Sequence, residues 1–108
     1  MARHTSDIEL DNAKIVKYAT DFETVTSNST ATKSMTLCDA SDGAFNVTLP
    51  APTSSGRIFM IKKSDSSSNI VTISPDEGTI DGMTSYDLSV QYQGLRVQDC
   101  GGHYYVIG

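Results

Sequence analysis

The sequence predicts an all-β fold, a small antiparallel β-sandwich or barrel of jelly-roll type that follows an N-terminal arm. Turn signals of Gly, Pro, Asn and Asp recur about every 8–12 residues, the strand spacing of sandwiches and barrels. The chain contains 14 Ser and 12 Thr residues, and these types favour turns and strands respectively. Apolar and polar residues alternate in segments such as Phe45–Leu49, which is the pattern of a half-buried strand.

The length of 108 residues suits one domain, which we divide into an arm, residues 1–18, and a β domain, residues 19–108. The arm carries two conflicting signals. Ser6–Glu9 matches a capping box and favours a helix start, whereas Ile8 and Leu10 alternate with polar residues as in a strand. A chain end with weak local preference often takes its structure from a neighbour. A docking arm and a disordered end therefore both stay open.

The first half of the β domain contains three expected strands, Asp21–Thr26, Lys33–Cys38 and Phe45–Leu49. In the second of these, Met35 and Leu37 share one side. The Asp39–Gly43 segment is a turn, because Asp side chains bond nearby N–H groups and Gly accepts positive φ. Pro50 and Pro52 end the third strand, since proline cannot donate to a ladder.

The second half begins with Ile58–Ile61, a continuous apolar run that predicts a strand covered on both faces. Lys62 and Lys63 follow and place charge at its end, which discourages edge-to-edge aggregation. Gly78 occupies a turn position that favours positive φ, and Gly101-Gly102 predicts a hairpin turn. The remaining strands are expected at Ile70–Ser74, Thr79–Asp81, Tyr86–Val90, Gly94–Gln98 and Tyr104–Ile107.

Charge excludes several classes of partner. The net charge is −5, and residues 19–108 carry five basic and ten acidic side chains. Nucleic-acid backbones and anionic membranes both require clustered Lys and Arg, so neither is expected as a partner. The chain has neither an apolar run of about 20 residues for a membrane crossing nor a signal-peptide core. We therefore expect synthesis in a cytoplasm.

The two cysteines, Cys38 and Cys100, should be reduced in a cytoplasm. Each stands beside an Asp in turn-like sequence, which is compatible with a position at the same end of the sandwich. Free thiols are favoured, and a disulfide formed after release into an oxidising medium remains open.

The residues indicate no reaction centre. His4 and His103 have no Ser or Cys in a nucleophile motif nearby, and the Asp39–Gly43 turn lacks the ligand spacing of a calcium loop. We therefore expect no enzyme activity, no cofactor and no metal. Four tyrosines are compatible with a sugar-stacking platform, but core or subunit-interface positions are favoured. These tyrosines are Tyr86, Tyr92, Tyr104 and Tyr105.

A series of short motifs, in this order and spacing, resembles a β module of tailed-bacteriophage structural proteins, found in tail-fibre knobs, head fibres and capsid decoration proteins. The motifs are Val47–Pro50, Ser55–Ile58, Ile61–Lys62, Asn69–Ile73, Thr79–Gly82, the Gly101-Gly102 turn and Tyr105–Ile107. The resemblance covers roughly residues 20–108. Two positions depart from it: Cys100 stands where a small polar residue or Gly is expected, and Tyr104 where Trp is frequent.

The resemblance implies a virion component without catalytic residues that assembles as a homotrimer. The short chain better suits a decoration or cement protein that binds the major capsid protein of the assembled head, on the capsid surface, after synthesis in the host cytoplasm. The alternative is a tail- or head-fibre knob that binds a host-surface receptor or glycan. The arm is then the candidate contact with the shell, with the apolar anchors Ile8, Leu10, Ile15 and Tyr18.

Overall fold

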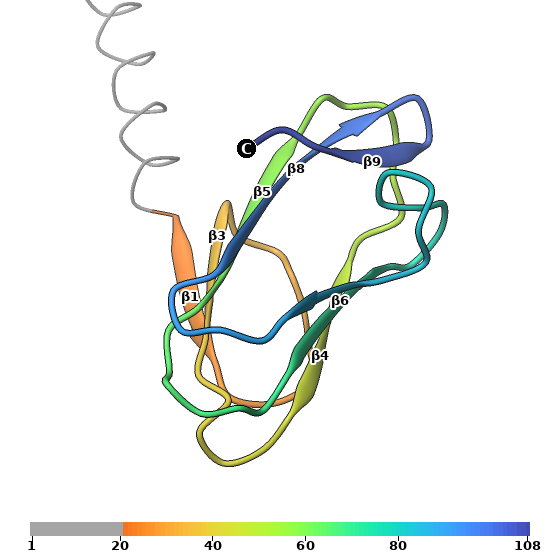
Figure 1. Ribbon diagram of the computed structural model, residues 1–108. Helices are drawn as coiled ribbons and strands as arrows, with labels where there is room; N and C mark the ends of the chain where they lie inside the picture. Colours follow the sequence, from red (N-terminus) through yellow and green to blue (C-terminus); the bar gives the residue numbers. More distant parts are fainter. Residues whose placement is uncertain (1–20) are drawn as a thin grey trace, which may run out of the picture.

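The alternating segments form strands of two sheets that pack face to face in a computed structural model, which describes residues 21–108 (Figure 1). The arm and its boundary at residue 18 lie outside the described residues. Sheet A has the strand order β1 (Phe22–Val25), β3 (Met35–Cys38), β5 (Ile58–Lys63), β8 (Gly94–Cys100) and β9 (His103–Val106). Sheet B has the order β2 (Ser29–Thr30), β4 (Phe45–Leu49), β6 (Val71–Pro75) and β7 (Tyr86–Leu88).

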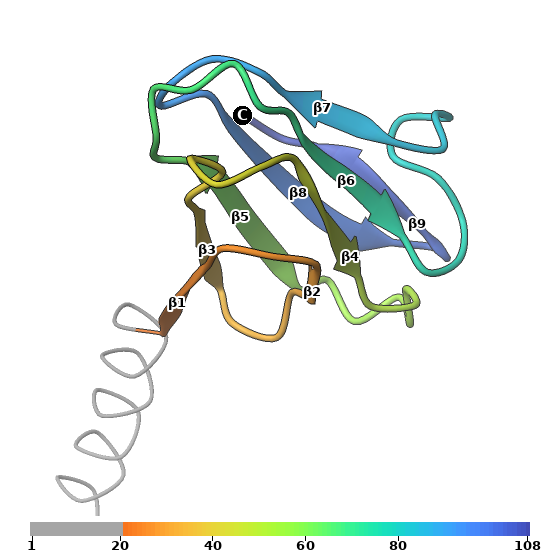
Figure 2. The same cartoon turned by 90° about the horizontal axis from the view of Figure 1, so that it is seen from below.

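The fold class is confirmed as all-β and two-layered, but the antiparallel jelly-roll expectation is wrong. The first six strands alternate between the two sheets, so that three successive coils of chain stack on one another (Figure 2). Two parallel strands that are neighbours in a sheet need a crossover connection between them. Here each crossover passes through a strand of the opposite sheet. As a result β1–β3–β5 and β2–β4–β6 pair in parallel, and the pairings of β7, β8 and β9 are antiparallel. Neither sheet closes into a barrel.

The core lies between the two sheets. Phe45, Val47 and Leu49 point inward, as their alternation predicts. In β3 the inward side carries Thr36 and Cys38, so Met35 and Leu37 share the outer side. Within sheet A, the buried rings of Phe59 in β5 and Tyr104 in β9 pack edge to face in this core, with 6.1 Å between their centroids. The remaining buried apolar residues are Ala31, Ala40, Ile61, Val71, Ile73, Ile80, Leu88, Leu95 and Val97.

Glycines set the turns that the sequence predicts. Gly78 has φ +76°, and a Cβ added there would lie 2.5 Å from the carbonyl oxygen of Gly102. Gly101 and Gly102 also have positive φ and form the hairpin turn between β8 and β9. The expected strand at Thr79–Asp81 is reduced to single bridges of Ile80 with Met83 and Tyr104.

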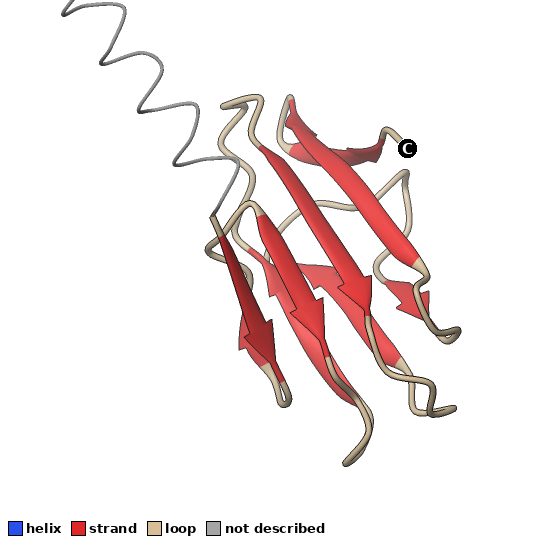
Figure 3. Ribbon diagram, turned by 90° about the vertical axis from the view of Figure 1, so that its left-hand side faces the viewer, coloured by secondary structure: helices blue, strands red, loops and turns tan. Residues whose placement is uncertain are grey.

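The described residues contain strands, turns and bends but no helix (Figure 3). Within them there is accordingly no helix with the length and hydropathy that a membrane crossing requires. The short β2 strand is absent from the sequence predictions, because its polar Ser29 and Thr30 carry no alternation signal.

Candidate functional site

One face of the sandwich combines exposed apolar side chains with cations, and we call it the outer face of sheet A. It consists of the strand positions whose side chains point away from sheet B. These positions are Phe22, Thr24, Met35, Leu37, Ile58, Met60, Lys62, Gly94, Arg96, Gln98, Cys100, His103 and Tyr105. No Asp or Glu stands at any of these described positions. In a chain of net charge −5, this face is therefore distinct from the rest of the surface.

Strand register aligns three apolar side chains of this face in one row that ends at a cation. Phe22 pairs with Met35, Met35 with Met60, and Met60 with Arg96, so the four side chains form one row across four strands. Phe22 is 59% exposed and Met60 43% exposed. The continuous apolar run of β5 predicts cover on both faces, yet residues 21–108 cover only its inner face. This expectation is therefore wrong for the described part of the chain.

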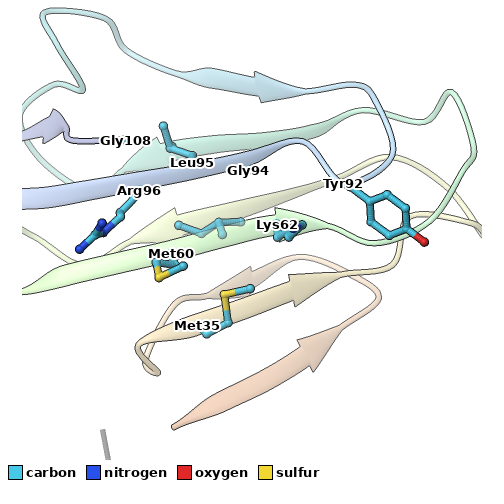
Figure 4. Close-up of a pocket in the computed structure, with 9 residues that line it drawn as sticks. Met35, Met60, Lys62, Tyr92, Gly94, Leu95, Arg96 and Gly108 are labelled. Atoms are coloured by element: carbon cyan, nitrogen blue, oxygen red, sulfur yellow. The ribbon is translucent and has the colours of Figure 1, made fainter. Parts of the chain in front are cut away.

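A shallow hollow of about 310 Å³ lies on the same face (Figure 4). Met35 and Met60 line one side of it, and Lys62, Tyr92 and Arg96 contribute the polar groups. Gly94 pairs with Lys62, and because Gly94 lacks a side chain the surface dips at this point. The Lys62 ammonium lies 5.8 Å from the centroid of the Tyr92 ring, a distance at which a cation is attracted to an aromatic face. The hollow can accept an apolar group accompanied by negative charge.

The outer face of sheet B has the opposite character. Its outward strand positions are Thr30, Asn46, Thr48, Thr72, Ser74 and Asp87. The Thr72 hydroxyl donates to Asp87 Oδ1 at 3.0 Å, so part of this face already satisfies its own hydrogen bonds. This uncharged or acidic surface suits solvent, whereas the outer face of sheet A suits a partner.

Lys63 is a buried charge, which corrects the expectation that it lies at the surface with Lys62. Its side chain is fully buried and its Nζ lies 2.9 Å from Asp65 Oδ2. Nζ also donates to the carbonyl oxygens of Ser67 at 2.8 Å and Asp65 at 3.2 Å. Burial works to raise the pKa of Asp65, but hydrogen bonds from Lys63, Ser67 and Ala40 outweigh it and hold this pKa well below its usual range. The pair has its donors satisfied and anchors a loop, so it has no free group for chemistry.

Asp99 anchors a second loop. Its carboxylate accepts the backbone N–H groups of Thr53 at 2.8 Å and Ser54 at 3.0 Å. Burial works to raise the pKa of Asp99, but these N–H donors and those of Ser55 outweigh it and lower the pKa. Asp99 therefore holds the chain between β4 and β5 against β8. Its carboxylate stays ionised because it accepts several N–H hydrogen bonds.

The histidine and cysteine predictions have separate outcomes. His103 is the first residue of β9, directly after the Gly101-Gly102 turn, and its Nδ1 lies 3.1 Å from both the backbone N and the Oγ1 of Thr79. Cys38 is buried and Cys100 is exposed, and both are free. Cys38 pairs with Lys63 at one end of β5, whereas Cys100 follows Gln98, which pairs with Ile58 at the other end. The two cysteines therefore lie at opposite ends of sheet A, which excludes the possibility that they share one end of the sandwich.

The tyrosines do not share one surface. Tyr104 is buried, and its hydroxyl donates to the carbonyl oxygen of Pro50 at 2.6 Å. Burial raises the pKa of this hydroxyl to about 12. Tyr86 packs against the core, while Tyr92 and Tyr105 are exposed. A platform of all four tyrosines is thereby excluded, since Tyr104 and Tyr105 point to opposite sides of β9.

The remaining sequence candidates provide no second site. Asp39 Oδ1 accepts the N–H of Ser41 at 3.0 Å, as expected of a turn residue. Within residues 21–108, no three His, Cys, Asp or Glu side chains are grouped to hold a metal ion. The arm anchors Ile8, Leu10, Ile15 and Tyr18 lie outside the described residues. Lys62 and Arg96 are surface neighbours of Met60 that were not predicted. Alternation along β5 from the inward Ile61 indicates an outward Lys62, whereas only the pairing of β5 with β8 places Arg96 beside Met60.

Comparison with protein-family models and with curated proteins finds no match for this chain.

Proposed function

We propose that the chain is a structural component of a tailed-phage virion, a capsid decoration or cement protein. In this proposal a homotrimer binds the major capsid protein on the assembled head shell and stabilises it, without enzyme activity. The motifs of residues 47–107 that resemble phage β modules support the assignment. The observation that carries it is the outer face of sheet A, because a rigid part that attaches to a larger surface needs an exposed apolar face.

Stabilisation would follow from mass action. A protein that binds the mature shell and not its competing states stabilises that shell by about 2.7 kcal/mol per site at a hundredfold excess over Kd. A trimer adds effective concentration, because each bound subunit holds the others near their own sites. In this proposal the arm anchors the contact with the shell through Ile8, Leu10, Ile15 and Tyr18, and the outer face of sheet A packs on the shell beside it.

Sedimentation with empty mature capsids tests the proposal. We expect the full chain to sediment with capsids and to have a trimeric mass in solution. Deletion of residues 2–18 should abolish capsid binding and leave a folded trimer, with Asn46→Ala on the outer face of sheet B as a matched control that still binds. Capsid binding by the deletion variant would refute the role of the arm, and a monomeric full chain would refute the trimer.

The second candidate function is a fibre knob that binds a host-surface receptor or glycan. The exposed Tyr92 beside Lys62 supports it, since aromatic faces stack on sugars and the hollow lies next to them. Binding to whole host cells combined with no binding to capsids would favour this function, and Tyr92→Ala should then reduce cell binding.

A further inference from the structure

Among residues 21–108, no segment packs on the apolar outer face of sheet A. β5 is apolar on both sides: Phe59 and Ile61 are buried inside, while Met60 is 43% exposed outside. Phe22 and Met35 extend the apolar row to the edge of the sheet. An apolar strand face of this kind is stabilised when another segment or another protein packs on it.

The charges on this face define the chemistry of its cover. Lys62 and Arg96 border the apolar row and the hollow, and no carboxylate stands at the outward positions described above. Lys62 and Arg96 can extend their charged ends beyond the methionines they border. A complementary partner is therefore apolar on one side and carries acidic groups.

We propose that residues 7–11 of the same chain, Asp-Ile-Glu-Leu-Asp, dock on the outer face of sheet A in the free protein. The segment alternates acidic and apolar residues, so an extended conformation separates Ile8 and Leu10 from the three carboxylates. Ile8 and Leu10 then cover Met35 and Met60, and the acidic residues pair with Lys62 and Arg96.

The chain geometry favours this occupant over a second copy. The described chain begins at Asp21, next to Phe22 at the start of β1, and β1 is the edge strand of sheet A. Ten residues between Asp11 and Phe22 span up to about 33 Å when extended. Met60 lies two strands from Phe22, at about 10 Å. A short tether gives an effective concentration in the millimolar range, above the micromolar concentration of free copies in solution.

Disulfide trapping in the full chain tests this docking. The background carries Cys100→Ser, because Cys100 is the exposed thiol, while the buried Cys38 has a raised pKa and low reactivity. Into it we place Leu10→Cys together with Met60→Cys, and in a matched variant Leu10→Cys together with Asn46→Cys. Asn46 is exposed on the outer face of sheet B, and the arm is long enough to reach either face.

We expect the Leu10–Met60 pair to crosslink at least about tenfold faster than the Leu10–Asn46 pair, because docking raises the effective concentration at one face only. Isotope-labelled and unlabelled protein are unfolded and refolded together before oxidation, so that any homotrimer contains both kinds of chain. Mass spectrometry of the linked peptides should then find crosslinks within single chains. Equal rates for the two pairs would overturn the proposal. Crosslinks that join labelled to unlabelled chains would overturn it too, in favour of the arm of a second copy.

A charge swap provides an independent check. Lys62→Glu with Arg96→Glu should slow the Leu10–Met60 crosslink, and Asp7→Lys with Glu9→Lys should restore part of the rate. Unchanged crosslinking in the Glu variant would refute the role of charge in the docking. These measurements use the free protein, so the outcome of the capsid experiment neither supports nor weakens this inference.

Discussion

The buried ion pair of Lys63 and Asp65 provides a quantitative test of how this sandwich is stabilised, through the substitution Asp65→Asn. The Lys63 ammonium is fully buried and has three acceptors, of which Asp65 Oδ2 at 2.9 Å is the charged one. Asp65 also accepts the N–H of Ala40 at 2.8 Å and that of Ser67 at 3.0 Å. Asn matches Asp in size, so the substitution removes the charge with little change in packing.

The expected effect is large because the ammonium loses its counter-charge without regaining water. Breaking a buried pair by removing one partner costs about 3–5 kcal/mol. For a domain of this size, 1 kcal/mol corresponds to about 4–8 °C in Tm, so even the lower bound predicts a decrease of about 12–24 °C. Such a loss is a substantial part of the 5–15 kcal/mol that is typical of whole domains.

Urea and thermal unfolding of the full chain, followed by circular dichroism, measure this effect. Lys63→Met and the double variant complete a thermodynamic cycle, and we expect the double variant to be less destabilised than the sum of the two single variants. A loss below about 1 kcal/mol for Asp65→Asn would refute the reasoning, since it would place the pair among exposed salt bridges.

The same carboxylate predicts a pH dependence. The pKa of Asp65 is lowered in the folded protein, whereas an Asp in the unfolded chain has a pKa of about 3.9. The folded protein therefore binds a proton at Asp65 less readily than the unfolded chain does. The contribution of Asp65 is therefore present above about pH 5 and is lost as pH falls below about 4, toward the folded-state pKa. Asp65→Asn should flatten the decrease in stability over this range, while Asp42→Asn, in an exposed turn position, should leave it unchanged.

Three further predictions concern turns, the core and the thiols. Gly78→Ala should lower the free energy of unfolding in urea by about 1–3 kcal/mol more than Gly82→Ala does. Both glycines have positive φ, but only at Gly78 would the added Cβ meet a backbone oxygen. Equal losses of stability in the two variants would contradict this prediction. Tyr104→Phe should cost about 1–2 kcal/mol, since the carbonyl oxygen of Pro50 loses its donor, and no change in urea midpoint would contradict it. A thiol reagent should modify Cys100 in the folded protein and Cys38 only after unfolding; two fast thiols would disprove the burial of Cys38.

Local pattern was sufficient to predict most strands and turns. Phe45–Leu49 has the same bounds in sequence and structure, and its inward residues are the expected ones. Gly78 adopts positive φ and Gly101-Gly102 forms a hairpin turn, both as predicted. These features depend on interactions between near neighbours in the chain, which alternation and glycine position record directly.

The candidate site was only partly predictable. The apolar run of β5 indicated a strand with two apolar faces, but which face remains exposed depends on the neighbours of β5 in the sheet. The burial of Lys63 required the Asp65–Ser67 loop to fold back over the strand end. These partners are close in sequence, but the loop itself is held in place by hydrogen bonds with the distant Ala40, which no local pattern records. Lys63 stands at an inward position beside the outward Lys62, and only the loop makes that position tolerable for a charge.

The sequence by itself determined that residues 21–108 form strands, where most of them lie, and where the chain turns, because these properties follow from side-chain alternation and backbone preference. Only the tertiary structure decided which strands become neighbours, that six consecutive strands coil in parallel between two sheets, and that Thr36 and Cys38 rather than Met35 and Leu37 face the core. The physical reason is that alternation divides a strand into two sides without ranking them. Which strands pair, and which side of each strand faces the core, depend on the total burial that all the strands achieve together.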